Sequence, residues 1–425
     1  MTDTIFALSS GAPPAALAVI RISGPDAGSA LSRLSGSLPQ PRRASLRRLQ
    51  GAEGALLDEA LVLWFPGPST ATGEDLAELH CHGGRAVVAA VEAALAAIPE
   101  LRRATAGEFT RRAFANGRID LAEAEGLADL LSAETEWQRA NALALSQGQL
   151  SRQIDDWRRR ILMLAAGVEA LLDFGDEDDV GEAGDVDRAG LAALIAELDD
   201  WLASPHAEAL REGLRVVIAG PPNSGKSTLF NALVGEDAAI TSDLAGTTRD
   251  VLQRPVAILG AAFQFLDTAG LRAPGADRIE ALGMERARQE LLRADLVLWL
   301  GPEGEGPEGA WEVEAQCDRS DHAKKSSPRH RVSAITGDGL SSLREDLVAA
   351  ARTRVPRPGR VALNARQRTI LADVADALKD ARAESDLLLV ADGLRAARAA
   401  LDALVGRTTT EDMLDALFGR FCIGK

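Results

Sequence analysis

The alternation of apolar and polar residues divides the chain into stretches of different character. The N-terminal stretch contains the short apolar runs TIFALSS, AALAVIRIS and ALVLWFPG, separated by Gly, Pro and Ser, and then the helix-like run RAVVAAVEAALAAI. Short apolar runs bounded by turn residues are typical of strands. We therefore expect residues 1–116 to form a small α+β domain.

Beyond this stretch the apolar residues recur at a helical period. Long Ala-, Leu- and Glu-rich segments fill residues 117–213. The same texture returns in residues 357–425, from Val361 onward, after the Pro- and Arg-rich segment TRVPRPGR. Residues 214–356 instead alternate strand-like and helix-like patterns, beginning with LRVVIAG. This order predicts a helical bundle built from both flanks, with an α/β domain inserted between them. We expect Trp137 and Trp157 in the bundle core.

Composition adds limits on compartment and partners. A chain of 425 residues is too long for a single hydrophobic core, and a content of 46% hydrophobic and 26% charged residues is typical of globular proteins. No apolar run reaches the roughly 18 residues of a membrane span, no basic region precedes an apolar stretch at the N-terminus, and three distant cysteines form no disulfide framework. The expected location is the cytoplasm.

The net charge of −16 is concentrated in one part of the chain. Residues 117–213 carry 8 basic and 22 acidic groups, a balance of −14, whereas the two other parts are near neutral. Such a chain is poorly suited to holding nucleic acid by counterion release. Any nucleic-acid contact is therefore expected to come mainly through a partner protein and not through a basic surface of this chain.

The strongest chemical signal is GPPNSGKS, from Gly220 to Ser227. It fits the phosphate-loop pattern, and it has the required context of a preceding strand, LRVVIAG, and a following helix, KSTLFNALVG. In such a loop, backbone N–H groups surround phosphate oxygens, Lys226 reaches the β- and γ-phosphates, and Ser227 ligates Mg²⁺. A chance Gly-rich turn is the alternative for these eight residues alone.

Two further segments in the expected order argue against that alternative. GTTRD offers hydroxyls for the Mg²⁺ shell, with Thr248 the better candidate, and DTAG follows the strand AAFQFL with a carboxylate at the strand end. We therefore predict a nucleotide and Mg²⁺ site. The predicted GTP-binding residues are Asn223, Ser224, Gly225, Lys226, Ser227, Thr228, Ser242, Asp243, Leu244, Ala245, Gly246, Thr247, Thr248, Asp267, Thr268, Ala269, Gly270, Asp318, Ser333 and Ala334.

Recognition of guanine is less direct, because the usual Asn-Lys-x-Asp motif is missing. The nearest match is AQCD, in which only Asp318 remains to pair with the guanine N1–H and amino group; Asp321 is a second candidate. Ser333 and Ala334 fit the loop whose backbone amide contacts the guanine oxygen. Loss of the Asn and Lys is expected to remove loop-bracing and base-stacking contacts, which predicts weak GTP affinity or relaxed base choice.

The residues that assist hydrolysis differ from those of many GTPases. The position after DTAG is Leu271, where a Gln often orients the attacking water. Glu280 is the candidate to hold that water; an exposed helical Glu is the alternative. Asn223 offers an amide oxygen to a monovalent cation, which would neutralise charge between the phosphates in place of an arginine finger.

Taken in order, AVIRISG, GEDLAELHCHGG, GEFTRRAFANGRIDLAEAEGLADLL, GPPNSGKSTLFNAL, GTTRD, DTAGLR and the terminal CIGK resemble the MnmE/TrmE family of tRNA-modifying GTPases, essentially end to end. The resemblance implies an N-terminal α+β domain that dimerises and binds a folate, a helical domain and an inserted Ras-like P-loop G domain. It also implies an FAD-dependent MnmG-like partner, with which such proteins add a carboxymethylaminomethyl or aminomethyl group at C5 of the tRNA wobble uridine.

The resemblance also implies roles for single residues. The potassium positions match Asn223, Ser242, Leu244 and Thr247, the magnesium positions match Ser227 and Thr248, and the catalytic glutamate matches Glu280. The positions for 5-formyltetrahydrofolate or 5,10-methylenetetrahydrofolate match Arg21, Glu78, Arg118 and Lys425, with Arg118 where the family has a lysine.

Two cysteine-containing segments allow more than one interpretation. Cys422 is a candidate nucleophile toward uridine C6, or a small buried residue beside the ligand pocket, which we favour. His80, Cys81 and His82 look like a metal cluster, but alternation in a strand points the cysteine away from the two histidines, so a shared ion is not expected.

The sequence-based hypothesis is a potassium-activated GTPase acting in tRNA modification. One alternative is a regulatory GTPase in RNA or ribosome assembly without modification activity, whose G-domain motifs would look the same. Another is a mainly structural partner of an MnmG-like protein with little turnover. The N-terminal α+β stretch and the CIGK tail favour the first hypothesis, because an assembly factor has no need of them.

Overall fold

The computed structural model of the chain describes residues 3–51, 54–174, 186–235, 253–267, 291–356, 359–408 and 410–424. Its internal contacts divide it into two compact units. One contains Met1–Ala128, Leu145–Arg159 and Arg398–Lys425, and the other contains Asp129–Ala144 and Arg160–Ala397. Within the described ranges, no helix combines the length and the apolar character that crossing a membrane requires.

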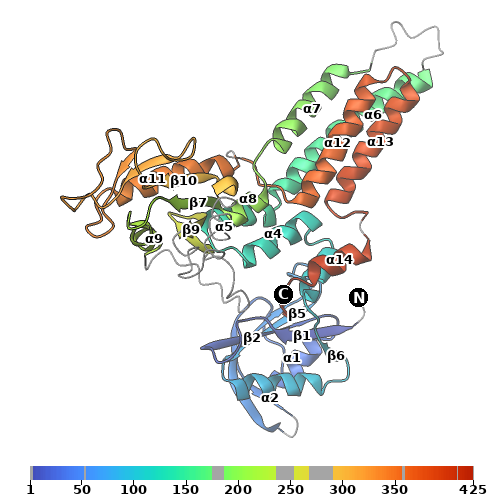
Figure 1. Cartoon of the computed structure of the whole chain (residues 1–425). Helices are drawn as coiled ribbons and strands as arrows, with labels where there is room; N and C mark the ends of the chain where they lie inside the picture. The colour runs from blue at the N-terminus through green and yellow to red at the C-terminus, as the bar shows by residue number, and fades with distance from the viewer. Residues whose placement is uncertain are drawn as a thin grey trace, which may run out of the picture. The chain divides into compact units, whose positions relative to one another are not determined.

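The N-terminal part of the first unit is a six-stranded sheet in the order β3-β4-β5-β2-β1-β6, antiparallel except for the parallel pair β1 and β6. Helices α1 and α2 lie together against this sheet (Figure 1) and share one apolar core with it. The elements are β1 (Thr4–Leu8), β2 (Leu17–Ser23), α1 (Ala27–Ser35), β3 (Ser45–Gln50), β4 (Leu56–Phe65), β5 (Leu76–His82), α2 (Arg85–Ala96) and β6 (Leu101–Arg103). The predicted α+β fold is confirmed.

The two faces of this sheet differ because successive side chains of a strand point to opposite sides. Ile20 and Ile22 of β2 lie in the core shared with the helices. Arg21, between them, faces the other side, together with its cross-strand partner Glu78 of β5. The period of the strand therefore separates the core from the polar face.

The helical segments also form where the 3.6-residue pattern predicts them. Helices α7 and α12 pack side by side along their length (Figure 1), and Trp157 of α6 is fully buried, as predicted. Apart from α1 and α2 and the helices of the α/β fold described below, the helices are α3 (Glu108–Ala115), α4 (Leu121–Leu131), α5 (Glu136–Ser146), α6 (Gln149–Phe174), α7 (Arg188–Leu202), α8 (Ala207–Glu212), α12 (Ala365–Ala383), α13 (Leu387–Leu404) and α14 (Glu411–Phe418).

The second unit contains the predicted α/β fold. Its sheet has the order β12-β11-β10-β7-β9-β8, and every neighbouring pair is parallel except β8 and β9. Apolar clusters cover both faces, as expected for a parallel sheet between helices. The elements are β7 (Leu214–Ala219), α9 (Lys226–Val234), β8 (Gln253–Ile258), β9 (Ala261–Asp267), β10 (Leu296–Trp299), β11 (Trp311–Glu314), β12 (His330–Arg331), α11 (Leu340–Ala351) and the 3₁₀ turn η3 (Arg352–Arg354).

Trp137 corrects one sequence-based expectation. Its side chain packs against the core of the α/β sheet and not within a helical bundle, and its backbone N–H donates to the carbonyl of Gly260 in the β8–β9 turn at 3.2 Å. Helical periodicity identifies the apolar face of α5 but does not say which layer covers it. The start of α5 therefore serves as a support for the α/β sheet.

The C-terminal tail is docked within the first unit. Phe421 is buried beside Leu414 and Phe418, and Ile423 forms an antiparallel bridge with Ala106. Gly424 has a φ of +95°, and a Cβ built there would lie 2.0 Å from the carbonyl oxygen of Leu8. Only glycine allows the tail to approach β1 so closely.

Candidate functional site

The phosphate loop joins β7 to α9, at the carboxyl edge of the parallel sheet. Asn223 has a φ of +63° and Gly225 a φ of +89°, and Gly225 caps the start of α9 at Lys226. The ammonium of Lys226 is buried and donates to the carbonyls of Gly220 at 3.0 Å and Pro221 at 2.6 Å. The loop thus presents the positive end of a helix and a lysine at one point, which suits an anion such as a polyphosphate.

The loop residues also carry hydroxyl groups suited to a divalent cation. Ser227 is exposed at the start of α9, and the register of the sheet pairs Ile218 of β7 with Asp267 at the end of β9. The hydroxyl of Ser224 is buried without a hydrogen-bond partner, and buried polar groups in proteins are normally satisfied. Hydroxyl and carboxylate donors are the ligand types that Mg²⁺ prefers, so the residues fit that ion.

Several predicted site residues lie outside the described residues. They are Ser242, Asp243, Leu244, Ala245, Gly246, Thr247, Thr248, Thr268, Ala269, Gly270, Glu280 and Lys425. The described residues of the predicted nucleotide site, Asn223 to Thr228, Asp267, Asp318, Ser333 and Ala334, all belong to the α/β sheet or its loops.

A cavity of about 190 Å³ lies beside the phosphate loop. It is lined by Gly225, Thr228, Leu229, Ala315, Gln316, Asp318, Arg319, Val332, Ala334 and Ile335. The carboxylate of Asp318 accepts a 2.6 Å hydrogen bond from the Ser333 hydroxyl, and this bond keeps the pKa of Asp318 below its usual range. An ionised carboxylate in such a cavity can accept from the N1–H and amino group of a guanine base.

The geometry separates the two aspartate candidates. Asp318 lines the cavity, whereas Asp321 is bound by Arg319 through two contacts at 3.0 and 2.9 Å. Ser333 uses its own backbone N–H to reach the carbonyl of Asp338. Ala334, which lines the cavity, is therefore the one of the predicted pair whose amide fits contact with the base.

Sequence reasoning missed one contact of this site. The side-chain amide of Gln316, at the position of the missing lysine, donates to the carbonyl of Asn223 at 3.2 Å. The expectation that loss of the Asn and Lys removes loop bracing is therefore wrong. A signal was available, because Gln at this position keeps a long side chain with a hydrogen-bond donor.

The polar face of the N-terminal sheet brings two of the folate candidates together. Arg21 donates to one oxygen of Glu78 at 2.9 and 3.2 Å and lies 5.8 Å from the centre of the Phe109 ring. His80 lies 3.2 Å from the other Glu78 oxygen. Burial raises the pKa of Glu78, but the contacts with His80 and Arg21 outweigh it and lower that pKa below its usual value. The pair is thus half-buried, and its carboxylate is ionised.

The other candidates near this face are placed differently. Arg118 is exposed in the loop after α3, and its side chain lies against Gly73. Cys422 is exposed, and its carbonyl accepts from the amide of Gly107. The favoured interpretation of Cys422 as a small buried residue is wrong, because the bridge at Ile423 and the buried Phe421 anchor the tail on either side of it.

The His-Cys-His segment of β5 alternates as a strand should. Cys81 is fully buried in the core shared with α1 and α2, and burial, aided by the charge of Asp58, raises its pKa to about 12. His80 faces Glu78 on the other side, and His82 lies 2.8 Å from an oxygen of Asp58. Cys81 is therefore part of the apolar core, whereas His80 and His82 each contact a different carboxylate.

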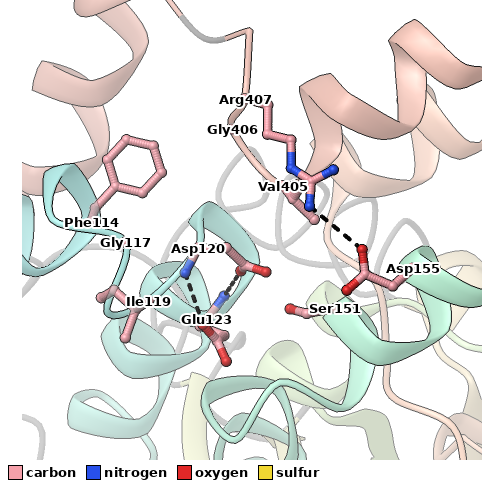
Figure 2. A pocket seen from close by; sticks show the side chains of 10 residues that line it. All are labelled: Phe114, Gly117, Ile119, Asp120, Glu123, Ser151, Asp155, Val405, Gly406 and Arg407. Carbon is pink, nitrogen blue, oxygen red and sulfur yellow. Dashed lines mark hydrogen bonds and ion pairs between the residues drawn. The ribbon is translucent and has the colours of Figure 1, made fainter. Parts of the chain in front are cut away.

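A second cavity, of about 340 Å³, lies in the first unit between the loop before α4, helix α6 and the segment after α13 (Figure 2). Asp120 and Glu123 cap the start of α4, each carboxylate accepting from the other's amide at 2.8 Å. Asp155 pairs with Arg407 at 3.6 Å. Burial raises the pKa values of Asp120 and Glu123. These contacts give the lining carboxylates structural roles.

Comparison with known proteins covers the whole chain. Residues 4–118 match the model of the GTP-binding protein TrmE N-terminus, and residues 121–422 match that of the MnmE helical domain. Proteins named tRNA modification GTPase MnmE from Novosphingobium aromaticivorans and Erythrobacter litoralis are each 60% identical over 100% of both chains. A solved G domain of the FeoB iron transporter of T. maritima is 24% identical over 32% of this chain and 98% of that chain, with a TM-score of 0.23, too low to add to these matches.

The two family models together account for nearly all of the described residues, and the relatives match from end to end. The phosphate loop, its buried lysine and the adjoining cavity lie in the part of the chain that carries the α/β sheet. The chain therefore belongs to the MnmE family of tRNA modification GTPases.

Proposed function

We propose that the protein hydrolyses GTP and that its hydrolysis cycle drives modification of C5 of the wobble uridine in certain tRNAs. The observation that carries this proposal is the phosphate loop, with Lys226 buried at the start of α9. Substitution of Lys226 by Ala should abolish GTP hydrolysis. Lys379→Ala, which removes an exposed lysine of α12 paired with Asp199, is the matched control and should keep the wild-type rate. Equal rates in both variants would refute the assignment.

The proposed organisation has three parts: an N-terminal domain over residues 1–116, a helical domain over 117–213 and 357–425, and a G domain over 214–356. The G domain would hold Mg²⁺ through Ser227 and Thr248, beside Asp267. Mg²⁺ neutralises charge on the β- and γ-phosphates when bound. In this proposal Glu280 holds the attacking water, because Leu271 has no polar group.

A potassium ion is proposed to be bound by Asn223, Ser242, Leu244 and Thr247. Support comes from Asn223, whose exposed amide lies on the phosphate loop in a left-handed conformation, and from the preference of K⁺ for several neutral oxygens. GTP hydrolysis should be faster in potassium than in sodium chloride at equal ionic strength. Equal, low rates in both salts would exclude a potassium-coupled mechanism.

A tetrahydrofolate carrying a one-carbon group is proposed to bind at Arg21, Glu78, Arg118 and Lys425. Glu78 supports this assignment, because an ionised carboxylate held by Arg21 can accept from ring N–H groups. Binding of 5-formyltetrahydrofolate, measured by calorimetry, should be lost in Glu78→Gln. Glu92→Gln, on helix α2, is a matched control outside the polar face and should bind normally.

The N-terminal sheet is also proposed to mediate a homodimer. Leu46 of β3 and its cross-strand partner Leu61 of β4 are exposed, at 59% and 45%, and Leu17 of β2 and Leu56 of β4 are exposed in the same sheet. Contiguous exposed apolar surface on a soluble protein is typical of interaction sites. Sedimentation should show a dimer that weakens when both leucines are replaced by Ser.

The proposed assembly includes an FAD-dependent MnmG-like partner in the cytoplasm, and that partner provides most of the tRNA contact. The charge of −14 in residues 117–213 supports this division of labour. Filter binding of tRNA at physiological salt should be weak for this protein alone and strong with the partner. Tight binding by the protein alone would contradict the proposal.

A further inference from the structure

The base-binding loop, residues 315–322, departs from the usual guanine motif, yet it is tied at two points. Gln316 donates from its side-chain amide to the carbonyl of Asn223 in the phosphate loop at 3.2 Å. A Cβ at Gly225 would lie 3.0 Å from the Gln316 amide nitrogen, so glycine there allows Gln316 to pack against the loop. The first tie therefore joins the loop that faces the base to the loop that faces the phosphates.

The backbone at this first tie is itself unusual. Asn223 and Gln316 have φ values of +63° and +59°, in a region that residues other than glycine rarely adopt. Such conformations persist where the surrounding contacts fix them, and they cluster at functional sites. Here the two residues bond to each other, so each helps to hold the other's conformation.

The second tie is His322. Its Nε2 lies 2.8 Å from an oxygen of Glu314 at the end of β11, and its Nδ1 lies 2.5 Å from the carbonyl of Arg319, next to Asp318. Both partners are acceptors only, so both ring nitrogens must carry a proton and the ring must be an imidazolium. The His322 side chain is 8% exposed and that of Glu314 is 1% exposed.

The charges around His322 favour this state. Glu314 of β11 faces it, and Arg331 of β12 contacts the same carboxylate at 3.0 Å. The loop itself contributes Asp318 and Asp321. The residues after it contribute Lys324, whose charge acts in the opposite direction and lowers the pKa of His322, and Lys325, whose amide donates to Glu314. The hydrogen bonds to Glu314 and to the Arg319 carbonyl raise the pKa of His322 above its ordinary value.

We propose that Gln316 and His322 are the positioning residues of the base-binding loop in this chain, in place of the missing Asn and Lys. Gln316 fastens the loop to the phosphate loop, and His322 fastens it to β11, so that Asp318 is held at the cavity. The proposal rests on the proposed function only in that the site binds a guanine nucleotide. It makes guanine-nucleotide affinity depend on the protonation of one histidine.

The sign of that dependence follows from the raised pKa. At pH values below about 6.5, the ordinary pKa of histidine, the His322 ring is fully protonated and both of its contacts hold the loop. The tie is lost as the pH rises through the higher pKa of the folded protein. GDP affinity should therefore fall with increasing pH above about 6.5, a range in which Asp318, whose pKa is lowered, stays ionised.

The test is calorimetric binding of GDP to the full chain between about pH 6 and pH 8.5. Gln316→Met, which keeps the length and removes the donor, should weaken binding about two- to tenfold, as expected for one neutral hydrogen bond. Gln316→Lys keeps a donor toward Asn223 and should bind more tightly than Gln316→Met. His322→Gln should bind more weakly at the acidic end and lose the pH dependence.

His82→Gln makes the same chemical change in the N-terminal sheet and should keep the wild-type profile. Circular dichroism spectra that match the wild type would show that each variant is folded. If the wild type binds GDP and both Gln316→Met and His322→Gln bind it equally well at every pH, the proposed ties are refuted. If the wild type itself fails to bind guanine nucleotides, the proposed function fails instead.

Discussion

Glu108 gives the most quantitative prediction, because it is buried at the start of α3 within a network of arginines. Its carboxylate accepts from Arg102 at 2.8 Å, from Arg112 at 3.1 Å, and from the amide of Thr105 at 2.9 Å. Arg112 is fully buried and also bonds Asp3. Glu108→Gln keeps the shape of the side chain and removes the charge that these donors require.

The magnitude follows from the pKa of Glu108. Burial raises that pKa, but the hydrogen bonds from Arg102, the Thr105 amide and Arg112 outweigh burial and lower it from 4.5 to about 2. A difference of about 2.5 between the unfolded and folded pKa values corresponds to about 3 kcal/mol of stability near pH 7. Because the pKa of Glu108 is lower in the folded protein than in the unfolded chain, this stability is present above pH 4.5 and is lost as the pH falls toward 2.

Hydrogen exchange of β1 and α3 amides, followed by mass spectrometry in increasing urea, measures the free energy of opening at this site. Glu108→Gln should lower it by about 3 kcal/mol near pH 7 and by about 2 kcal/mol near pH 3.5. Comparison of the two proteins at the same pH cancels the intrinsic exchange rate. A difference below about 0.5 kcal/mol near pH 7, or one that does not change with pH, would refute the ionic account.

Three further predictions concern the tail, the helices and the thiols. Gly424→Ala places a Cβ against the carbonyl of Leu8 at a φ of +95°, so the tail should undock and carboxypeptidase should release its residues faster; an unchanged rate would contradict the docking. Trp157→Ala, at a fully buried position, should cost about 3–5 kcal/mol in urea unfolding, and a cost under about 1 kcal/mol would place Trp157 outside the core. Near pH 8, a thiol reagent should label exposed Cys422 in the native protein but Cys81, whose pKa burial raises to about 12, only after unfolding; rapid native labelling of Cys81 would contradict this.

The sequence predicts what depends on local pattern. LRVVIAG forms β7, KSTLFNALVG supplies α9, and the phosphate loop between them has the left-handed residues that its glycines and asparagine allow. The alternation in β2 and β5 correctly separates the buried isoleucines from Arg21 and Glu78. These features follow from the periods of strands and helices and from the conformational freedom of glycine.

What the sequence does not predict depends on contacts between distant segments. Arg112 looks like a surface arginine in GEFTRRAF, but it is fully buried because Asp3, Glu74 and Glu108 converge on it from three segments. Trp137 has the helical period of its neighbours, yet the layer that covers it is the α/β sheet. Pairings across large sequence separations are set by the packing of the whole fold, which a single sequence does not display.

The central claim, that this GTPase acts in modification of the tRNA wobble uridine, is tested most directly by mass spectrometry of nucleosides from tRNA. The comparison is between cells that lack the gene, cells that carry it, and cells that carry Lys226→Ala. The account predicts that the C5-modified wobble uridines disappear without the gene and are not restored by Lys226→Ala. Persistence of these nucleosides in cells that lack the gene would contradict it.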